Sequence, residues 1–149
     1  MPPGPEPLPA ANLLEMGDPS AQSGILGDVL GPQSGVTWRW TNQHPRFRVW
    51  FDPTRRWDFV ARFTVPGAVL NAVGPLTLRF LVNGRELEVR KFDKDQDYAV
   101  SKPVPAEMLA GAETATLGFD VDPVLVSKGD GVKLGVLIQE IGLAPSPQP

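Results

Sequence analysis

Hydrophobic and polar residues alternate with a period close to two along most of the chain from Val36 onward. The clearest example is residues 57–65, where every second residue is apolar and the residues between them are mostly polar. This pattern is typical of β-strands that bury one face and expose the other. The same pattern over residues 36–41 places Trp38 and Trp40 on one face, which we expect to be buried.

The dipeptide Asn83-Gly84 separates two further alternating segments and predicts a β-hairpin. Asparagine and glycine tolerate the positive φ angles of the type I′ turn, whose twist matches that of the flanking strands. The second segment, residues 86–92, contains Leu87 and Val89. We expect these two side chains to join the buried face of the preceding strand.

Five further segments are predicted to be strands: 12–16, 46–51, 98–104, 117–121 and 132–143. Residues 17–35 and 42–45 are expected to be loops, because they are rich in glycine, proline and polar residues. Short helical turns are expected at 66–75 and 105–110, and neither is long enough to connect parallel strands. The predicted fold is therefore all-β, a two-sheet antiparallel β-sandwich of jelly-roll type.

The prolines divide the chain into a core and two flanks. Ten of the 17 prolines lie within residues 1–35 or within the last six residues. Proline fixes φ and supplies no amide donor, so clustered prolines favour an extended polyproline-like conformation. We therefore predict a Pro-rich tail at 1–11, a single domain at 12–143 and a second Pro-rich tail at 144–149.

Composition excludes several kinds of chemistry. The chain has no cysteine and one histidine, so it can form neither a disulfide, a cysteine nucleophile nor a zinc site of several histidines or cysteines. No Ser-His-Asp arrangement can be assembled around His44, and no catalytic residue is expected. A structural calcium site could be assembled from three aspartates, Asp120, Asp122 and Asp130. No other cofactor is expected.

Charge and hydropathy limit the partners. The net charge is −3 with 14 basic residues, which argues against nucleic acid as a partner. The sequence contains no run of about 20 apolar residues, the length that a membrane-spanning helix needs. The sequence does not begin like a signal peptide, so an extracellular or periplasmic location is favoured only if a signal has been removed.

The candidate binding residues surround one exposed tryptophan. Alternation places Trp50 on the same face as Arg46 and Arg48, opposite the apolar residues of the same segment. An indole beside two guanidinium groups can stack against a sugar ring and donate hydrogen bonds, or it can form a cation–π pair that covers the sheet. The polar residues that precede this segment could bond further hydroxyl groups or an acidic sugar: Asn42, Gln43 and His44.

Four segments occur in a recurring order that resembles one domain family: WRWT with RFRVWF, LRFLVNGRELEVRKF, YAVSKPVPAEML and FDVDPVLVSKGDGVKLGVLIQEIGL. This order is similar to that of the galactose-binding-like and carbohydrate-binding-module-like β-sandwich domains of bacteria. The resemblance covers about residues 24–143 and rests on order and spacing. It implies non-catalytic sugar binding by an accessory domain, through loops at one end of the sandwich or through an exposed sheet face.

Three functions remain open from the sequence. The preferred one is a non-catalytic carbohydrate-binding module that stacks a sugar on Trp50. The alternative is a structural or protein-interaction β-sandwich, whose Pro-rich flanks connect it to a partner or a neighbouring domain. An exposed apolar patch would favour this alternative. The third is a small glycan-active enzyme, which would need two carboxyl groups a few ångströms apart in a cleft.

Overall fold

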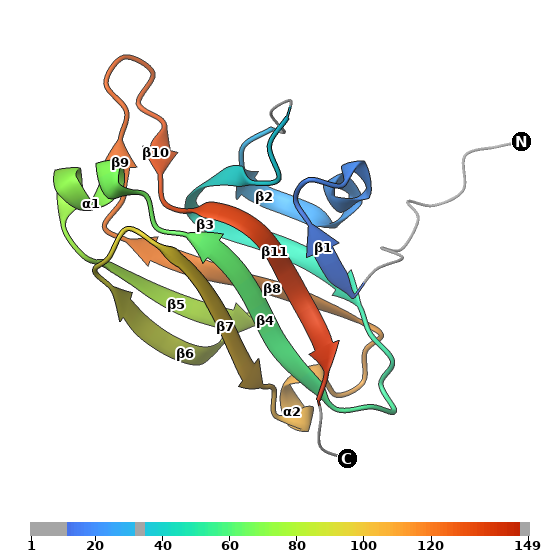
Figure 1. Ribbon diagram of the computed structural model, residues 1–149. Helices are drawn as coiled ribbons and strands as arrows, with labels where there is room; N and C mark the ends of the chain where they lie inside the picture. Colours follow the sequence, from blue (N-terminus) through green and yellow to red (C-terminus); the bar gives the residue numbers. More distant parts are fainter. Residues whose placement is uncertain (1–11, 32–34, 147–149) are drawn as a thin grey trace, which may run out of the picture.

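The computed structural model describes residues 12–31 and 35–146 and consists mainly of antiparallel strands (Figure 1). The strands are β1 (Leu13–Glu15), β2 (Ile25–Val29), β3 (Arg39–Trp50), β4 (Trp57–Thr64), β5 (Leu76–Val82), β6 (Arg85–Phe92), β7 (Asp97–Pro103), β8 (Thr114–Asp122), β9 (Leu125–Val126), β10 (Lys133–Leu134) and β11 (Leu137–Pro145). The helical elements are the 3-10 helix η1 (Pro19–Gly24) and the α-helices α1 (Gly67–Val73) and α2 (Ala106–Leu109).

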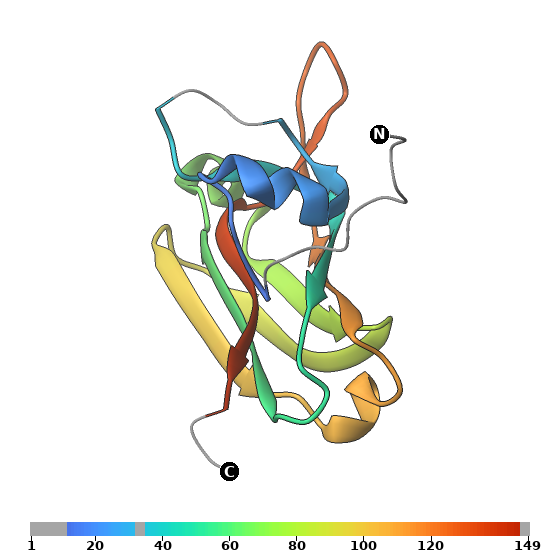
Figure 2. The ribbon, with the colours of Figure 1, turned by 90° about the vertical axis from the view of Figure 1, so that its right-hand side faces the viewer.

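The main sheet curls into two facing layers. Its strand order is β6-β5-β8-β3-β11-β4-β7, with β1 paired to β11 and β2 paired to β3. The long strand β3 joins the layers, because its first residues pair with β11 and its last five pair with β8. Figure 2 shows β4, β7 and β11 on one side and β5, β6 and β8 on the other. The predicted two-sheet antiparallel sandwich is confirmed.

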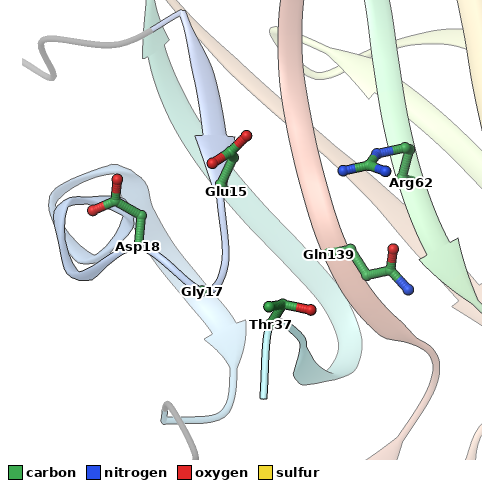
Figure 3. A pocket seen from close by; sticks show the side chains of 6 residues that line it. All are labelled: Glu15, Gly17, Asp18, Thr37, Arg62 and Gln139. Atoms are coloured by element: carbon green, nitrogen blue, oxygen red, sulfur yellow. The ribbon is translucent and has the colours of Figure 1, made fainter. Parts of the chain in front are cut away.

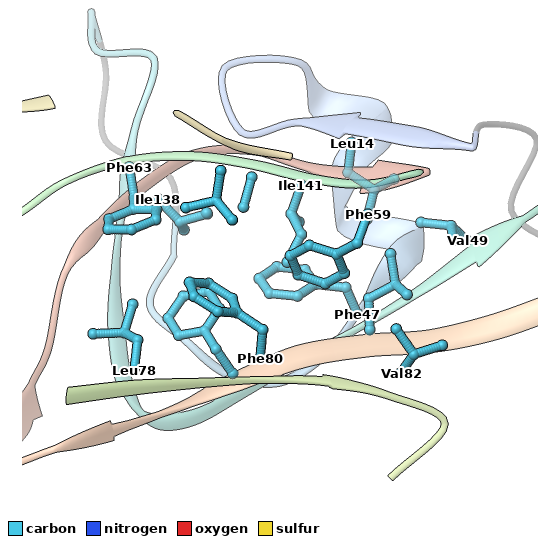
Figure 4. Packing of buried hydrophobic residues seen from close by; sticks show 14 of the residues in the cluster. Leu14, Phe47, Val49, Phe59, Phe63, Leu78, Phe80, Val82, Ile138 and Ile141 are labelled. Atoms are coloured by element: carbon cyan, nitrogen blue, oxygen red, sulfur yellow. The ribbon is translucent and has the colours of Figure 1, made fainter. Parts of the chain in front are cut away.

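The hydrophobic core fills the space between the layers (Figure 4). Alternate residues of each strand point inward, so phenylalanines from both layers meet at its centre. Phe80 on β5 packs against Phe59 and Phe63 on β4, with ring centroids 5.6 and 6.3 Å apart. Phe119 on β8 lies 6.0 Å from Phe80 by the same measure, and all four side chains are fully buried. The predicted core tryptophan Trp57 is also buried.

The prediction of a loop at residues 42–45 is wrong, because β3 runs without a break from Arg39 to Trp50. Pro45 is tolerated where β3 passes from its ladder with β11 to its ladder with β8, since a residue between the two ladders need not donate to either. Arg39 and Thr41 face inward and are buried. Trp38 and Trp40, which were expected to be buried, are only half-buried, and of the two Trp40 packs against the core.

Arg39 and Thr41 remain hydrogen-bonded inside the sandwich. The guanidinium of Arg39 donates from Nη1 to Oε1 of Gln22 at 2.8 Å and from Nε to the carbonyl of Met16 at 3.4 Å. Burial lowers the pKa of Arg39, because desolvation disfavours its charged form. Oγ1 of Thr41 accepts from the amide of Val136 at 3.1 Å. These bonds satisfy polar groups that would otherwise make burial unfavourable.

The predicted hairpin at Asn83-Gly84 is confirmed. Both residues have positive φ, 51° and 80°, as a type I′ turn requires. Leu87 is half-buried and packs against the core, as expected, but the expected burial of Val89 is not observed, because a β-bulge opposite Phe80 and Leu81 shifts the register. Phe80 pairs with Glu88, so Val89 lies on the outer face and is exposed.

Two further expectations need correction at the ends of the domain. Residues 17–35 are not one long loop, because they contain η1 and the strand β2, which pairs with β3. Strand β11 continues through Ala144 and Pro145, which pair with Asp58 and Trp57, so the sheet extends into the predicted C-terminal tail. The predicted tail at residues 1–11 and the last three residues lie outside the described residues.

Candidate functional site

Three of the six predicted binding residues line one open hollow at the N-terminal part of β3. This β3 hollow has a volume of about 350 Å³ and is lined by Asp28, Asn42, Gln43, His44, Gly131 and Lys133. Strand β3 supplies three of these residues, β2 supplies Asp28, and the β9–β10 hairpin supplies the other two. In Figure 1 this hairpin projects from the upper end of the sandwich.

Hydrogen bonds fix the walls of the β3 hollow. Nδ2 of Asn42 donates to the carbonyl of Lys133 at 2.7 Å, which fastens the hairpin to β3. The amide of His44 donates to Oδ2 of Asp28 at 2.9 Å, which fastens β2 to the same strand. Nζ of Lys133 lies 3.4 Å from Oε1 of Gln43. The hollow therefore presents amide, imidazole, carboxylate and ammonium groups from three segments.

His44 is oriented by an ionic network beside the hollow. Its Nδ1 donates to Oδ1 of Asp120 at 2.8 Å, and Nη2 of Arg46 donates to the same oxygen at 2.7 Å. Burial raises the pKa of Asp120, but hydrogen bonds from Arg46 and His44 outweigh it, so the pKa lies below its ordinary value. Because Nδ1 is engaged, Nε2 of the exposed His44 ring is the nitrogen that a ligand can reach.

Replacing Asp120 with asparagine should remove one pH-dependent contribution to stability. Because the pKa of Asp120 is lowered, its ionised carboxylate stabilises the folded state at pH values above its ordinary pKa of 3.8. This contribution is lost as the pH falls through the pKa of the folded state. We expect Asp120→Asn to cost about 1 kcal/mol at neutral pH. Urea denaturation at several pH values should show the difference between the two proteins closing below about pH 4.

The pKa of Asp52 is also lowered, by hydrogen bonds from Thr54. The readout is therefore the difference between wild type and variant, in which the contribution of Asp52 cancels. A difference that stays constant down to pH 2 would contradict the assigned role of Asp120.

The two predicted arginines are used differently. Nη1 of Arg46 donates to the carbonyls of Pro45 and Phe119 at 3.0 and 3.1 Å, so with Asp120 its guanidinium joins β3 to β8. It is largely occupied by the protein itself. Arg48 is half-buried, and its Nε is buried without a hydrogen-bond partner among the described residues.

Trp50 ends β3 and lies on its outer face, 38 % exposed. It pairs with Thr114 of β8. Trp50 is six residues from His44 on one continuous strand, which corresponds to about 20 Å. The structure thus places the indole and the β3 hollow on the same strand, at a distance greater than one sugar ring can span.

The proposed calcium ligands do not come together. Within residues 12–31 and 35–146, no group of three histidine, aspartate or glutamate residues could hold a metal ion. Asp120 is engaged by Arg46 and His44, and Asp130 accepts from the amide of Val132 within the β9–β10 hairpin. The calcium hypothesis is therefore wrong for the described residues.

Within residues 12–31 and 35–146, no helix is both long and apolar enough to cross a bilayer.

A larger hollow lies on the outer face of the layer that contains β4 and β11, beside β1. It measures about 630 Å³ and is lined by Glu15, Gly17, Asp18, Thr37, Arg62 and Gln139. Figure 3 shows the carboxylates of Glu15 and Asp18 on one side and the polar ends of Arg62 and Gln139 on the other. Arg62 also pairs with Glu140, at 3.2 Å between Nη2 and Oε2.

This larger hollow was missed from the sequence, although one signal was present. Gln139 and Glu140 are consecutive polar residues in an otherwise apolar segment. The structure has a register irregularity between Ile138 and Glu140, and both polar residues are partly exposed. A β-bulge re-aims side chains in this way, so two adjacent polar residues in a central strand indicate such a position.

The comparisons with known proteins concern the fold. No family model matches the chain, and no curated protein matches it. Among solved structures, a family 35 carbohydrate-binding module from Clostridium thermocellum is similar with a TM-score of 0.50 and 7% identity, covering 90% of this chain and 97% of that one. The chain therefore has the β-sandwich fold of that module, as the sequence resemblance implied.

Two larger proteins contain a similar unit. The delta-endotoxin Cry8Ea1 from Bacillus thuringiensis gives a TM-score of 0.54 at 14% identity over 90% of this chain. The 4-O-methyl-α-glucuronidase BtGH115A, with specificity for decorated arabinogalactans, gives 0.53 at 13% identity over 85% of this chain. This chain spans only 24% of the endotoxin and 17% of the glucuronidase.

Proposed function

We propose that the domain is a non-catalytic carbohydrate-binding module that binds a sugar in the β3 hollow. The observation that carries this proposal is the gathering of Asn42, Gln43 and His44 with Asp28 and Lys133 around one open polar hollow. Sugars present many hydroxyl groups, each of which can donate and accept a hydrogen bond. The hollow offers both acceptors and donors, and one solved structure with a similar fold over nearly its whole length is a carbohydrate-binding module.

His44 makes the most specific contact in this proposal. Asp120 holds the ring through Nδ1, so Nε2 faces solvent in a fixed orientation. A preoriented group loses little conformational entropy on binding, and each hydrogen bond then contributes more to affinity. Lys133 and Oδ1 of Asp28, the carboxylate oxygen that does not accept from the amide of His44, would bond neighbouring hydroxyl groups of the same sugar.

Trp50 provides a second contact in the proposal. Its exposed indole can stack against a pyranose ring, which presents an apolar face of C–H groups. About 20 Å of strand separates Trp50 from His44, so a ligand that touches both must be an oligosaccharide. Arg48 lies between them on the same outer face. Its Nε has no hydrogen-bond partner among the described residues, but it is buried, so it is available to an intervening hydroxyl only after a local rearrangement.

The two contacts can be separated by ligand length. His44→Ala should weaken binding of a short ligand and of a long one by about tenfold, the effect of losing roughly 1.4 kcal/mol. Trp50→Ala should weaken binding of the oligosaccharide by a similar factor and leave the monosaccharide unaffected. The measurement is isothermal titration of each variant with a glycan selected on an array and with its terminal monosaccharide.

Asn71→Ala serves as the matched control, because Asn71 is an exposed polar residue on α1 outside the β3 hollow. It should bind as the wild type does. The proposal would be refuted if no neutral or acidic glycan bound, or if glycan binding were unchanged in both His44→Ala and Trp50→Ala.

A further inference from the structure

An apolar groove lies at the other end of the sandwich, beside α2. Figure 1 shows α2 at the bottom, far from the β9–β10 hairpin. The groove has a volume of about 480 Å³, and most of its lining is apolar: Phe51, Pro53, Trp57, Pro103, Val104, Pro105, Ala106, Leu109, Ala110 and Gly111. Three prolines and other apolar side chains at one groove form a surface suited to other proline rings, as in domains that bind polyproline II segments, whereas the buried Trp57 adds little to this surface.

Two cations border this α2 groove. Arg55 and Arg56 belong to its lining and are exposed. Neither forms a direct ion pair with a residue that the structure describes, although the charge of Arg55 helps to lower the pKa of Asp52. Guanidinium groups beside an apolar surface complement a peptide that carries both proline rings and a carboxylate.

One segment of the chain has this chemistry. Residues 1–11, MPPGPEPLPAA, contain five prolines and Glu6 but no lysine or arginine. A polyproline segment loses little conformational entropy on docking, because its backbone is already restricted. We propose that the α2 groove docks residues 1–11 of this protein, with prolines against its apolar lining and Glu6 beside Arg55 and Arg56.

The register of the strands places the start of the described chain within reach of the groove. Leu13 pairs with Gly142 on β11, and Pro145, three residues further along β11, pairs with Trp57 of β4. Three residues along a strand and two strands across correspond to about 15 Å. Eleven residues in a polyproline conformation would span about 34 Å, so the segment is long enough to reach Trp57 in the lining of the groove.

The absence of cysteine permits a direct test on the intact chain. A nitroxide attached to Gly4→Cys would be the only spin label, since no other thiol is present. We expect it to broaden the amide signals of Arg55, Ala106 and Gly111 several-fold more than those of the β9–β10 hairpin. Equal broadening at both ends of the sandwich, or none at the groove, would overturn the proposal.

Charge variants test the assigned contact. The double variant Arg55→Gln, Arg56→Gln and, separately, Glu6→Gln should each reduce the selective broadening, and so should high salt. Arg85→Gln is the control, because Arg85 is an exposed arginine on β6 that does not line the groove. Selective broadening that survives the double variant would refute the role of these two arginines.

Mixing distinguishes docking within one chain from docking between two copies. Spin-labelled chain without ¹⁵N is added to ¹⁵N-labelled chain without a spin label. Broadening at the groove in this mixture assigns the segment to a second copy, and broadening only in the doubly labelled chain assigns it to the same copy. Both results support the proposed occupant. The α2 groove is separate from the β3 hollow, so failure here leaves the sugar-binding proposal intact.

Discussion

Replacing Phe80 with alanine should lower the free energy of unfolding by about 3–5 kcal/mol. The side chain is fully buried and joins the two layers, because its ring packs against Phe59 and Phe63 on β4 and against Phe119 on β8. Rigid strands on both sides cannot collapse into the space that alanine leaves, so a cavity adds to the lost burial. Urea denaturation followed by tryptophan fluorescence measures the change.

Val89→Ala is the control for Phe80→Ala. Val89 lies on the outer face of β6, paired with Arg79, and is 46 % exposed. Its truncation should change the free energy of unfolding by less than about 0.5 kcal/mol. A loss below about 1 kcal/mol for Phe80→Ala would contradict a tightly packed core between two layers.

Replacing Gly118 with alanine should cost about 1–3 kcal/mol through overpacking. A Cβ at this position would lie 2.3 Å from the carbonyl oxygen of Pro45 and 2.8 Å from Cδ of Arg46. The glycine therefore leaves the space through which Arg46 crosses β8 to reach Asp120. Displacing Arg46 should also disturb the orientation of His44, which shares that carboxylate.

The matched control is Gly27→Ala. Gly27 pairs with the same Arg46 from the opposite side, and a Cβ there would meet nothing within 4 Å. Thermal denaturation should show a clear loss for Gly118→Ala and little change for Gly27→Ala. In the NMR spectrum, the ring signals of His44 should shift in the first variant alone. Equal stability of the two variants would contradict the close approach at Gly118.

Local patterns predicted the strands and the tight turn well. The alternation from Trp57 to Val65 reports one buried face, and Asn83-Gly84 satisfies the φ requirement of its turn without help from distant residues. The errors arose where tertiary pairing overrides a local signal. Pro45 suggested a break in β3, but it lies between two ladders and interrupts neither.

The same reason explains the error in β6. Its two-residue turn alone would place Leu87 opposite Phe80, and the bulge that moves Glu88 into that position has no strong sequence signal. Register beyond a bulge depends on packing against distant strands, so alternation within one strand cannot specify it.

The candidate site was predictable only as far as one strand supplies it. Asn42, Gln43 and His44 are consecutive, so the sequence could group them. Asp28 and Lys133 reach the same hollow from segments far away in the chain, and only the pairing of β2 and the β9–β10 hairpin with β3 brings them there. The ion pair between Arg46 and Asp120 likewise forms only because β3 pairs with β8.

The proposed sugar-binding function is tested most directly by chemical-shift mapping. The ¹⁵N-labelled intact chain is titrated with an oligosaccharide selected on a glycan array, and the shifted amides are placed on the structure. We predict saturable shifts at Asp28, residues 42–44 and Lys133, together with the indole signal of Trp50. Shifts confined to other surfaces, or no saturable shift with any glycan on the array, would contradict the proposal.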